Sequence, residues 1–214
     1  MELPFLNRHL EMERLQRLLA GRGSSLAVIY GRRRLGKSRL LRQSLGRNPA
    51  VYYVGDARES NLQRHALARG ISVLLPGFDT VHYPEWEALL ARWWSEARPG
   101  WTLILDEFPA LVAEAPEIPS VLQKLIDARR GPNLILSGSS QRLMQGLMLE
   151  RTAPLFGRAS ETLRIGPLPA GWICQALNLT SEAAVEAWSI WGGVPRYWEL
   201  AADFESTEAA RSLS

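Results

Sequence analysis

The sequence predicts an α/β protein in which helices cover both faces of a parallel sheet, and three observations lead to this fold class. Apolar runs typical of buried strands recur at 25–30, 51–54, 101–105, 133–137 and 161–165. Patterns at helical spacing separate these runs, so the strands lie too far apart for hairpins and need crossover connections. The first run leads through a glycine-containing loop into a helical pattern, which is the order that a phosphate-binding loop requires.

The helical patterns fall into a core and a smaller C-terminal unit. One helix follows the first loop and ends at Gly46, and others are expected at 57–69, 84–97, 119–130 and 140–150. In the second of these four, Pro84 suits the first helical position, and one face carries Trp86, Leu89, Leu90, Trp93 and Ala97. After Pro167–Pro169 the strand pattern ends, and helices are expected at 170–177, 181–191 and 195–202. We therefore expect a core at 1–168 and a helical lid at 169–214, with Trp188, Trp191 and Trp198 in the core of the lid.

The segment Gly31–Ser38 reads GRRRLGKS and matches the pattern G-x-x-x-x-G-K-S. Its glycines let successive backbone N–H groups point at phosphate oxygens, and the following helix adds the positive end of its dipole. Lys37 would reach the β- and γ-phosphates, and the Ser38 hydroxyl could ligate Mg²⁺. The alternative is a structural turn beside a basic helix. We expect a nucleoside triphosphate to bind Gly31, Arg32, Arg33, Arg34, Leu35, Gly36, Lys37, Ser38 and Arg39.

A second motif ends the apolar run before residue 106. Asp106 and Glu107 follow this expected strand directly. Because the carboxyl ends of parallel strands line the ligand crevice, Asp106 would lie beside Ser38 and the metal ion. Glu107 would then orient or deprotonate a water for in-line attack on the γ-phosphate. Two acids after a strand could also form a solvated turn, an alternative that the phosphate loop makes less favourable.

Composition and charge fit a globular protein of 214 residues, with 46% hydrophobic and 22% charged residues. No apolar run reaches the length of a membrane span, and the start lacks the features of a signal peptide, so we expect a cytoplasmic protein without a membrane partner. Cys174 is the single cysteine, so an internal disulfide is excluded. We expect its side chain to be buried and to act as a small hydrophobic group. The three histidines show no metal-ligand spacing.

The net charge of +3 conceals an uneven distribution. Residues 1–47 hold 11 Lys or Arg and 3 acids, whereas residues 48–214 hold 14 and 19. The basic residues from Arg32 to Arg42 create a positive field that would concentrate the phosphates of a nucleotide or of a nucleic acid. A solvated helix face is a third interpretation. Nucleotide binding is favoured over nucleic acid because no interleaved aromatic residues accompany the cluster.

Several motifs in a fixed order resemble a known family. They are Phe5–Arg8 with Glu11, the phosphate loop, LILDEFP at 103–109, LILSGSS at 134–140, PLFGR at 154–158 and GGVPRYW at 192–198. Together they resemble the archaeal-type ATPase family, in the AAA+/STAND branch of P-loop NTPases. The resemblance implies strand order 5-1-4-3-2, with an additional strand between the phosphate-loop strand and the Asp-Glu strand. It also implies a helical lid over the adenine.

The resemblance implies further roles. Ser139 becomes the sensor of the γ-phosphate or attacking water, although a serine-rich turn capping the helix from Gln141 fits the same residues. Arg158 precedes the last core strand, where related ATPases place an arginine finger. Arg8 and Pro195 are assigned to nucleotide binding, the latter through an adenine-contacting G-x-P motif. The alternative is that Gly192 or Gly193 ends one helix and Pro195 begins the next.

The expected function is binding of Mg·ATP and its slow hydrolysis as a nucleotide-gated switch. Adenine follows from the resemblance, and no guanine-reading N-K-x-D stretch occurs. Family members usually continue into a winged-helix region and a nuclease-like domain, so we expect a fragment or a minimal form. The expected partners besides ATP and ADP are DNA, bound through such a region, and further copies of the chain, which would associate in a nucleotide-dependent way. The alternatives are a nucleic-acid-binding module with vestigial ATP binding, and a kinase, against which the Asp106–Glu107 pair favours activating water.

Overall fold

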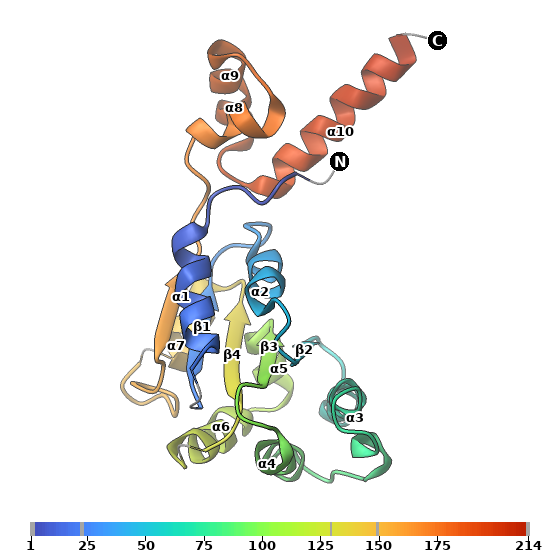
Figure 1. Cartoon of the computed structure of the whole chain (residues 1–214), viewed down its shortest axis with the longest axis vertical. Coiled ribbons are helices and arrows are strands. Elements are labelled where there is room, and N and C mark those ends of the chain that lie inside the picture. The colour runs from blue at the N-terminus through green and yellow to red at the C-terminus, as the bar shows by residue number, and fades with distance from the viewer. Residues whose placement is uncertain (1–2, 22–23, 129, 149, 213–214) are drawn as a thin grey trace.

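The chain has a body built on a five-stranded sheet and, beyond one end of that sheet, a lobe of three helices (Figure 1). The computed structural model describes residues 3–21, 24–128, 130–148 and 150–212, and of residues 204–212 it describes the backbone alone. The arrow of β4 points toward the three-helix lobe in Figure 1, so the carboxyl ends of the parallel strands face it.

Strands and helices alternate along the body. The strands are β1 (Leu26–Tyr30), β2 (Ala50–Val54), β3 (Thr102–Asp106), β4 (Asn133–Gly138) and β5 (Glu161–Arg164). The helices of the body are α1 (His9–Leu19), α2 (Lys37–Leu45), α3 (Ser60–Ser72), the 3₁₀ turn η1 (Phe78–Thr80), α4 (Trp86–Glu96), α5 (Phe108–Glu114), α6 (Ile118–Asp127) and α7 (Gln141–Met148). The lobe that the sequence predicts to be a lid, called the lid lobe below, consists of α8 (Gly171–Leu177), α9 (Ser181–Trp191) and α10 (Pro195–Ser212).

The sheet is parallel throughout, with the order β2-β3-β4-β1-β5. This is the predicted order 5-1-4-3-2 taken from the other edge, and β4 is the predicted additional strand between β1 and β3. All residues of β1, β3 and β4 are buried because these strands have helices on both faces. The fold class predicted from the sequence is confirmed.

Alternation along the strands divides the core into two layers. On one face, Leu26 and Val28 of β1 join the cluster that α3, α4, α5, α6 and α7 cover. On the other face, Ala27 and Ile29 pack against α1 and α2 through residues such as Leu41. The sheet and the helices on its two faces therefore form the three layers of the body.

The lid lobe has a separate hydrophobic cluster. Trp198 is fully buried there, and Trp188 and Trp191 pack against it, as expected for core residues of the lid. The N-terminal Leu3 and Leu6 belong to the same cluster, so the first residues of the chain pack with the lid. Cys174 is half-buried at this cluster, less enclosed than expected. The division at 168/169 remains a prediction.

Several helix boundaries differ from the predicted ones. Helix α3 begins at Ser60 because the buried Gln63 holds residues 55–59 as a loop, donating to the Asp56 and Arg58 carbonyls at 3.0 and 2.8 Å. Helix α4 begins at Trp86, since Glu85 is extended, and Pro84 therefore lies before the helix and not at its first position. Helices α1 and α5 have no counterpart in the prediction, and α10 continues ten residues beyond the predicted end, to Ser212.

No helix in the described part of the chain is both long and apolar enough to cross a bilayer.

The packing of α2 on the sheet gives a first prediction. Leu41 is 0% exposed between α2 and the strands, so Leu41→Ala should lower the free energy of unfolding by about 2–5 kcal/mol through lost contacts and a cavity. Urea unfolding followed by circular dichroism measures this difference. The control is Leu10→Ala on α1, which is 74% exposed and should change stability by less than about 0.5 kcal/mol. Equal effects of the two substitutions would contradict the assigned packing.

Candidate nucleotide-binding site

The phosphate loop, residues 31–38, joins the carboxyl end of β1 to α2. Gly31 lies against the chain after β5, where a Cβ would come within 2.3 Å of the Ile165 carbonyl oxygen. Arg34 and Gly36 have φ angles of 69° and 86°, and this left-handed backbone turns the chain into α2 at Lys37. The loop thus has the curled geometry that directs backbone N–H groups toward an anion at a helix N-terminus.

Lys37 reaches across this loop. Its Nζ donates to the carbonyl oxygens of Gly31 and Arg32, at 2.7 and 3.0 Å. Burial lowers the pKa of Lys37, while the negative charges of Glu107 and Asp106 act in the opposite direction. The ammonium group is therefore held inside the loop by two carbonyls and by the electric field of two carboxylates.

Asp106, the last residue of β3, is held by three donors. Its Oδ2 accepts hydrogen bonds from the Ser38 hydroxyl at 2.9 Å and from the Tyr52 hydroxyl. Its Oδ1 accepts the backbone N–H of Glu107 at 3.0 Å. Burial alone would raise the pKa of Asp106, but these hydrogen bonds, with the Ser137 hydroxyl close by, outweigh it and lower the pKa. Asp106 is thus an ionised carboxylate beside Ser38, as the sequence predicts.

This pair of oxygen donors fits a magnesium ion. Mg²⁺ prefers oxygen ligands and usually takes one or two from the protein, with water and phosphate oxygens supplying the rest. Ser38 and Asp106 offer a hydroxyl and a carboxylate in hydrogen-bond contact, and Ser38 lines an open crevice of about 710 Å³. Among the residues that the structure describes, no three His, Cys, Asp or Glu side chains gather as a metal site.

Glu107 turns away from Asp106 and toward β4. Its φ of 50° is a left-handed conformation that costs free energy for a residue with a Cβ. Its Oε2 accepts the Ser139 hydroxyl at 2.8 Å and the Ser139 N–H at 3.4 Å. Arg33 Nε donates to the Ser139 hydroxyl oxygen at 3.3 Å. The structure therefore brings Glu107, Ser139 and Arg33 together at the crevice.

The cap of α7 is made by the next serine. Ser140 Oγ accepts the N–H of Leu143 at 3.4 Å, whereas Ser139 bonds to Glu107. The capping and sensing interpretations of this turn hence use different hydroxyls and do not compete.

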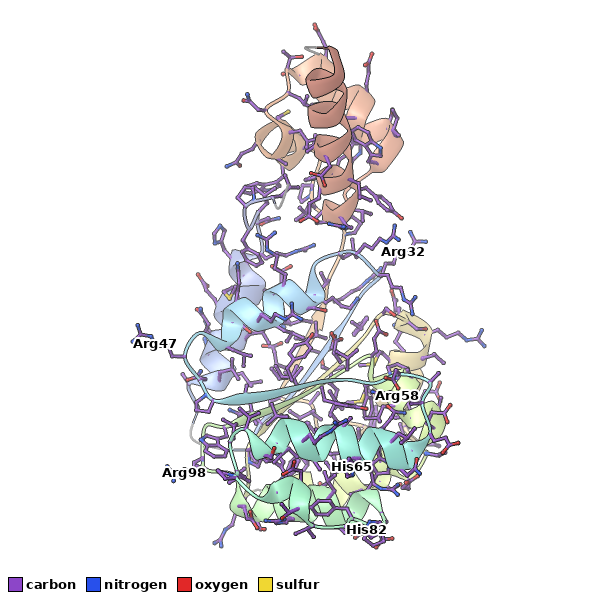
Figure 2. The ribbon with its side chains drawn as sticks, turned by 90° about the vertical axis from the view of Figure 1, so that its right-hand side faces the viewer. Arg32, Arg47, Arg58, His65, His82 and Arg98 are labelled. Atoms are coloured by element: carbon purple, nitrogen blue, oxygen red, sulfur yellow. The ribbon has the colours of Figure 1, made fainter. Side chains whose placement is uncertain are left out.

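The crevice lies between the phosphate loop and the start of α10, and its lining is strongly charged. Its charged residues are Arg33, Arg34, Lys37, Arg39, Arg42, Arg196, Glu107 and Glu199. The Arg34 guanidinium lies over the Tyr197 ring, 5.4 Å from its centre, and Arg39 lies 3.8 Å from a Glu199 carboxylate oxygen. Figure 2 shows Arg32 on the loop just below the lid lobe. The first turn of α10 thus contacts the phosphate loop directly.

Arg8 and Pro195 meet at a second, much smaller cavity beside the same loop. The cavity is about 30 Å³, which holds little more than one water molecule. Leu3–Leu6, Leu35, Gly36, Arg39 and Leu168 complete its lining. Arg8 is buried and donates to the Gly166 carbonyl and, at 3.1 Å, to Glu11. The two residues adjoin the loop, but a purine fits between them only if the N-terminal segment and α10 separate.

Arg158 is the one predicted site residue that lies at the other end of the sheet. It precedes β5, and since the strands are parallel it lies at their amino ends, opposite the phosphate loop. Its guanidinium makes two hydrogen bonds to the Asp127 carboxylate, at 2.7 and 2.8 Å. It also donates to the Pro154 carbonyl at 2.9 Å. Within one chain, Arg158 does not reach the site.

Sequence reasoning missed Tyr52. The run 51–54 reads as an apolar strand, yet its two tyrosines must face opposite sides of the sheet. Tyr52 faces α2 and reaches Asp106, and Tyr53 faces the other layer. A phenol two residues before the end of a strand that neighbours the Asp-Glu strand was the available signal, but it requires the strand order to be read.

The fold and the site together define a P-loop nucleotide-binding domain of the AAA+ type. The model of a family described as an ATPase domain predominantly from Archaea matches residues 5–200, and the chain belongs to this family. An uncharacterized protein of Methanocaldococcus jannaschii is 31% identical over 201 residues. The match covers 91% of this chain and 43% of that relative, so the chain spans less than half of its length.

Solved structures share the fold. A Walker-type ATPase of Pyrococcus abyssi matches with a TM-score of 0.70 at 19% identity, covering 98% of this chain and 73% of that one. The ORC1 protein of Aeropyrum pernix, solved in complex with DNA, matches with a TM-score of 0.58 at 19% identity, covering 85% and 50%. At this identity these likenesses establish the fold alone.

The position of Arg158 gives a second prediction. Arg158→Ala should leave the affinity of the monomeric chain for ATP unchanged, because the guanidinium lies at the amino ends of the strands, opposite the phosphate loop. Its partly exposed pair with Asp127 should contribute less than about 1 kcal/mol to stability. Titration with a fluorescent ATP analogue at low protein concentration measures the affinity, and thermal unfolding measures the stability. A loss of affinity in dilute solution would show that Arg158 reaches the nucleotide of its own chain.

Proposed function

We propose that this domain binds Mg·ATP on the phosphate loop and hydrolyses it, and that the nucleotide state controls the position of the lid. The observation that carries the proposal is the hydrogen bond of 2.9 Å between Ser38 and Asp106 beside an open, basic crevice. A hydroxyl at a helix N-terminus and an ionised carboxylate at the carboxyl end of a strand in the same sheet are the two protein groups that a magnesium–phosphate site needs. Membership of an ATPase family supports the same conclusion.

In this proposal the loop amides and the N-terminus of α2 bind the phosphate chain, and Lys37 donates to its terminal oxygens. Lys37 would exchange its two carbonyl partners for phosphate oxygens. Ser38 and Asp106 would hold the magnesium ion, which neutralises charge on the β- and γ-phosphates when bound. Arg33 would add a further positive charge at the crevice.

Glu107 is the proposed base. Its carboxylate lines the crevice, and its partner Ser139 holds it toward the end of β4. A carboxylate so placed can orient a water and take its proton during attack on the γ-phosphate. Ser139 is suited to act as the sensor, because one hydroxyl contacts both Glu107 and Arg33 and would move with either.

The lid contacts support a switch. Tyr197 and Glu199, from the first two turns of α10, touch Arg34 and Arg39 of the phosphate-binding region. Phosphates compete for the same guanidinium groups, so nucleotide binding would weaken these contacts and shift α10. Separation of α10 from the N-terminal segment would also open the small cavity at Arg8 and Pro195 to the adenine.

Two partner proposals have less support. The Aeropyrum pernix ORC1 protein, which shares the fold, was solved in complex with DNA, and a basic crevice could bind a nucleic acid here. However, no interleaved aromatic residues accompany the basic cluster in the sequence, which favours the local phosphate site over a nucleic acid. Arg158 would act as a finger only on the nucleotide of a second copy of the chain.

The third prediction tests nucleotide binding. Lys37→Ala should weaken ATP binding about 10- to 100-fold, because it removes a charge-assisted hydrogen bond to the phosphates while the loop keeps its backbone. Equilibrium titration with a fluorescent ATP analogue measures the loss. Arg47→Ala is the control, since it removes the same charge from the far side of the body, as Figure 2 shows, and should leave the affinity unchanged. Equal affinities of the Lys37→Ala and wild-type chains would disprove the assigned site.

The fourth prediction separates hydrolysis from binding. Glu107→Gln keeps the size of the side chain but cannot accept a proton, so phosphate release should fall by about 10²–10⁴-fold while Mg·ATP still binds. Asp106→Asn should also weaken the magnesium dependence of binding, because it removes the charge beside Ser38. Steady-state phosphate release, alongside nucleotide binding over a magnesium titration, distinguishes the two variants. Wild-type turnover in Glu107→Gln would mean that another group activates the water.

A further inference from the structure

We propose that Tyr52 is a positioning residue for the magnesium site, and that its hydroxyl holds the Asp106 carboxylate in the orientation that Mg²⁺ requires. This inference rests on the proposed function, since it concerns the same metal site. No motif of the phosphate loop or of the Asp-Glu strand includes Tyr52, and its role follows from the neighbouring strand that it belongs to.

The position of Tyr52 is determined by the sheet. Strand β2 pairs with β3 so that Tyr52 lies opposite Ile104, two residues before Asp106. Its side chain is on the face that α2 covers, where the ring packs against the core of that layer. From there the hydroxyl donates to Asp106 Oδ2. The phenol thus reaches the carboxylate from a different element than Ser38 does.

The ring is held from above as well. The Arg42 guanidinium lies 5.3 Å from the centre of the Tyr52 ring, one helical turn beyond Ser38 on α2. A cation over an aromatic face stabilises both groups in place. Packing in the layer under α2 and the contact with Arg42 therefore both restrict the Tyr52 ring, and its hydroxyl points at Asp106 Oδ2.

Three donors leave Asp106 little freedom to rotate. Ser38 and Tyr52 share Oδ2, and the Glu107 N–H takes Oδ1. Ser38 is also expected to direct its oxygen at the metal, whereas the Tyr52 hydroxyl donates to the carboxylate. Groups that orient a metal-binding carboxylate in this way are worth about 10- to 100-fold in metal affinity. Loss of the Tyr52 hydroxyl should therefore weaken the binding of magnesium and leave the binding of the nucleotide phosphates unchanged.

The next residue of β2 offers a matched control. Tyr53 lies on the opposite face of the sheet, and its hydroxyl donates to the buried Gln63 Oε1 at 3.1 Å. Tyr53→Phe removes the same atom, from the same strand, and breaks one hydrogen bond to a buried acceptor. Tyr52→Phe likewise keeps its ring and the contact with Arg42. Both variants remove one phenol hydroxyl from β2, and only Tyr52→Phe removes the hydroxyl that contacts Asp106.

The experiment measures binding of a fluorescent ATP analogue to the full chain as Mg²⁺ is raised from a chelated baseline. We expect Tyr52→Phe to shift the magnesium midpoint upward about tenfold, with magnesium-free nucleotide binding unchanged. Tyr53→Phe should keep the wild-type midpoint. Titration of Mn²⁺ with nucleotide, followed by electron paramagnetic resonance, should report the same shift without relying on turnover.

Three results would overturn the inference. They are an unchanged midpoint in Tyr52→Phe, an equal shift in Tyr53→Phe, and a loss of magnesium-free binding as large as the loss with magnesium, which would make the role of Tyr52 structural. If wild-type chain binds nucleotide without any dependence on magnesium, the metal site itself is wrong and the proposed function fails with it. A wild-type chain that responds to magnesium, beside a Tyr52→Phe chain identical to it, refutes the positioning role alone.

Discussion

The Asp106 carboxylate at the end of β3 is the point on which the site depends. It accepts the Ser38 hydroxyl from α2, the Tyr52 hydroxyl from β2 and the N–H of Glu107. These bonds compensate the cost of burying a negative charge and lower its pKa, so the carboxylate stays ionised where three elements converge. The parallel sheet brings these elements together, because the carboxyl ends of β1 and β3 lie at the same end of the sheet, with β4 between the two strands.

Charge balance extends from Asp106 across the loop. Burial lowers the pKa of Lys37, but the negative charges of Glu107 and Asp106 oppose this effect. Arg33 donates to the Ser139 hydroxyl oxygen, and this hydroxyl donates to Glu107. Lys37 and Arg33 of the loop thus donate to acceptors of their own chain. A triphosphate with a magnesium ion would replace those acceptors by stronger ones, and this exchange gives a physical reason for the loop and α10 to respond together.

Much of the fold follows from the sequence, and the site follows in part. Fully buried strands such as β1 and β4 are recognisable as apolar runs. The motifs GRRRLGKS and Asp106–Glu107 could be placed at strand ends because each directly follows such a run. The contact of Tyr52 with Asp106 could not be read in the same way, since it depends on which strand lies beside which, whereas the position of Arg158 before the last strand of a parallel sheet already places it at the amino ends. The start of α3 depends on the buried Gln63, a tertiary constraint that local pattern does not contain.

Calorimetric titration of the wild-type chain with ATP and with AMP, each with magnesium and with a chelator, tests the central claim most directly. A site built on the phosphate loop and Asp106 predicts one ATP per chain, bound at least about tenfold more tightly than AMP in magnesium, with the difference reduced by the chelator. Equal binding of ATP and AMP regardless of magnesium, or no binding of ATP, would contradict the claim that this edge of the sheet is a magnesium-dependent phosphate site.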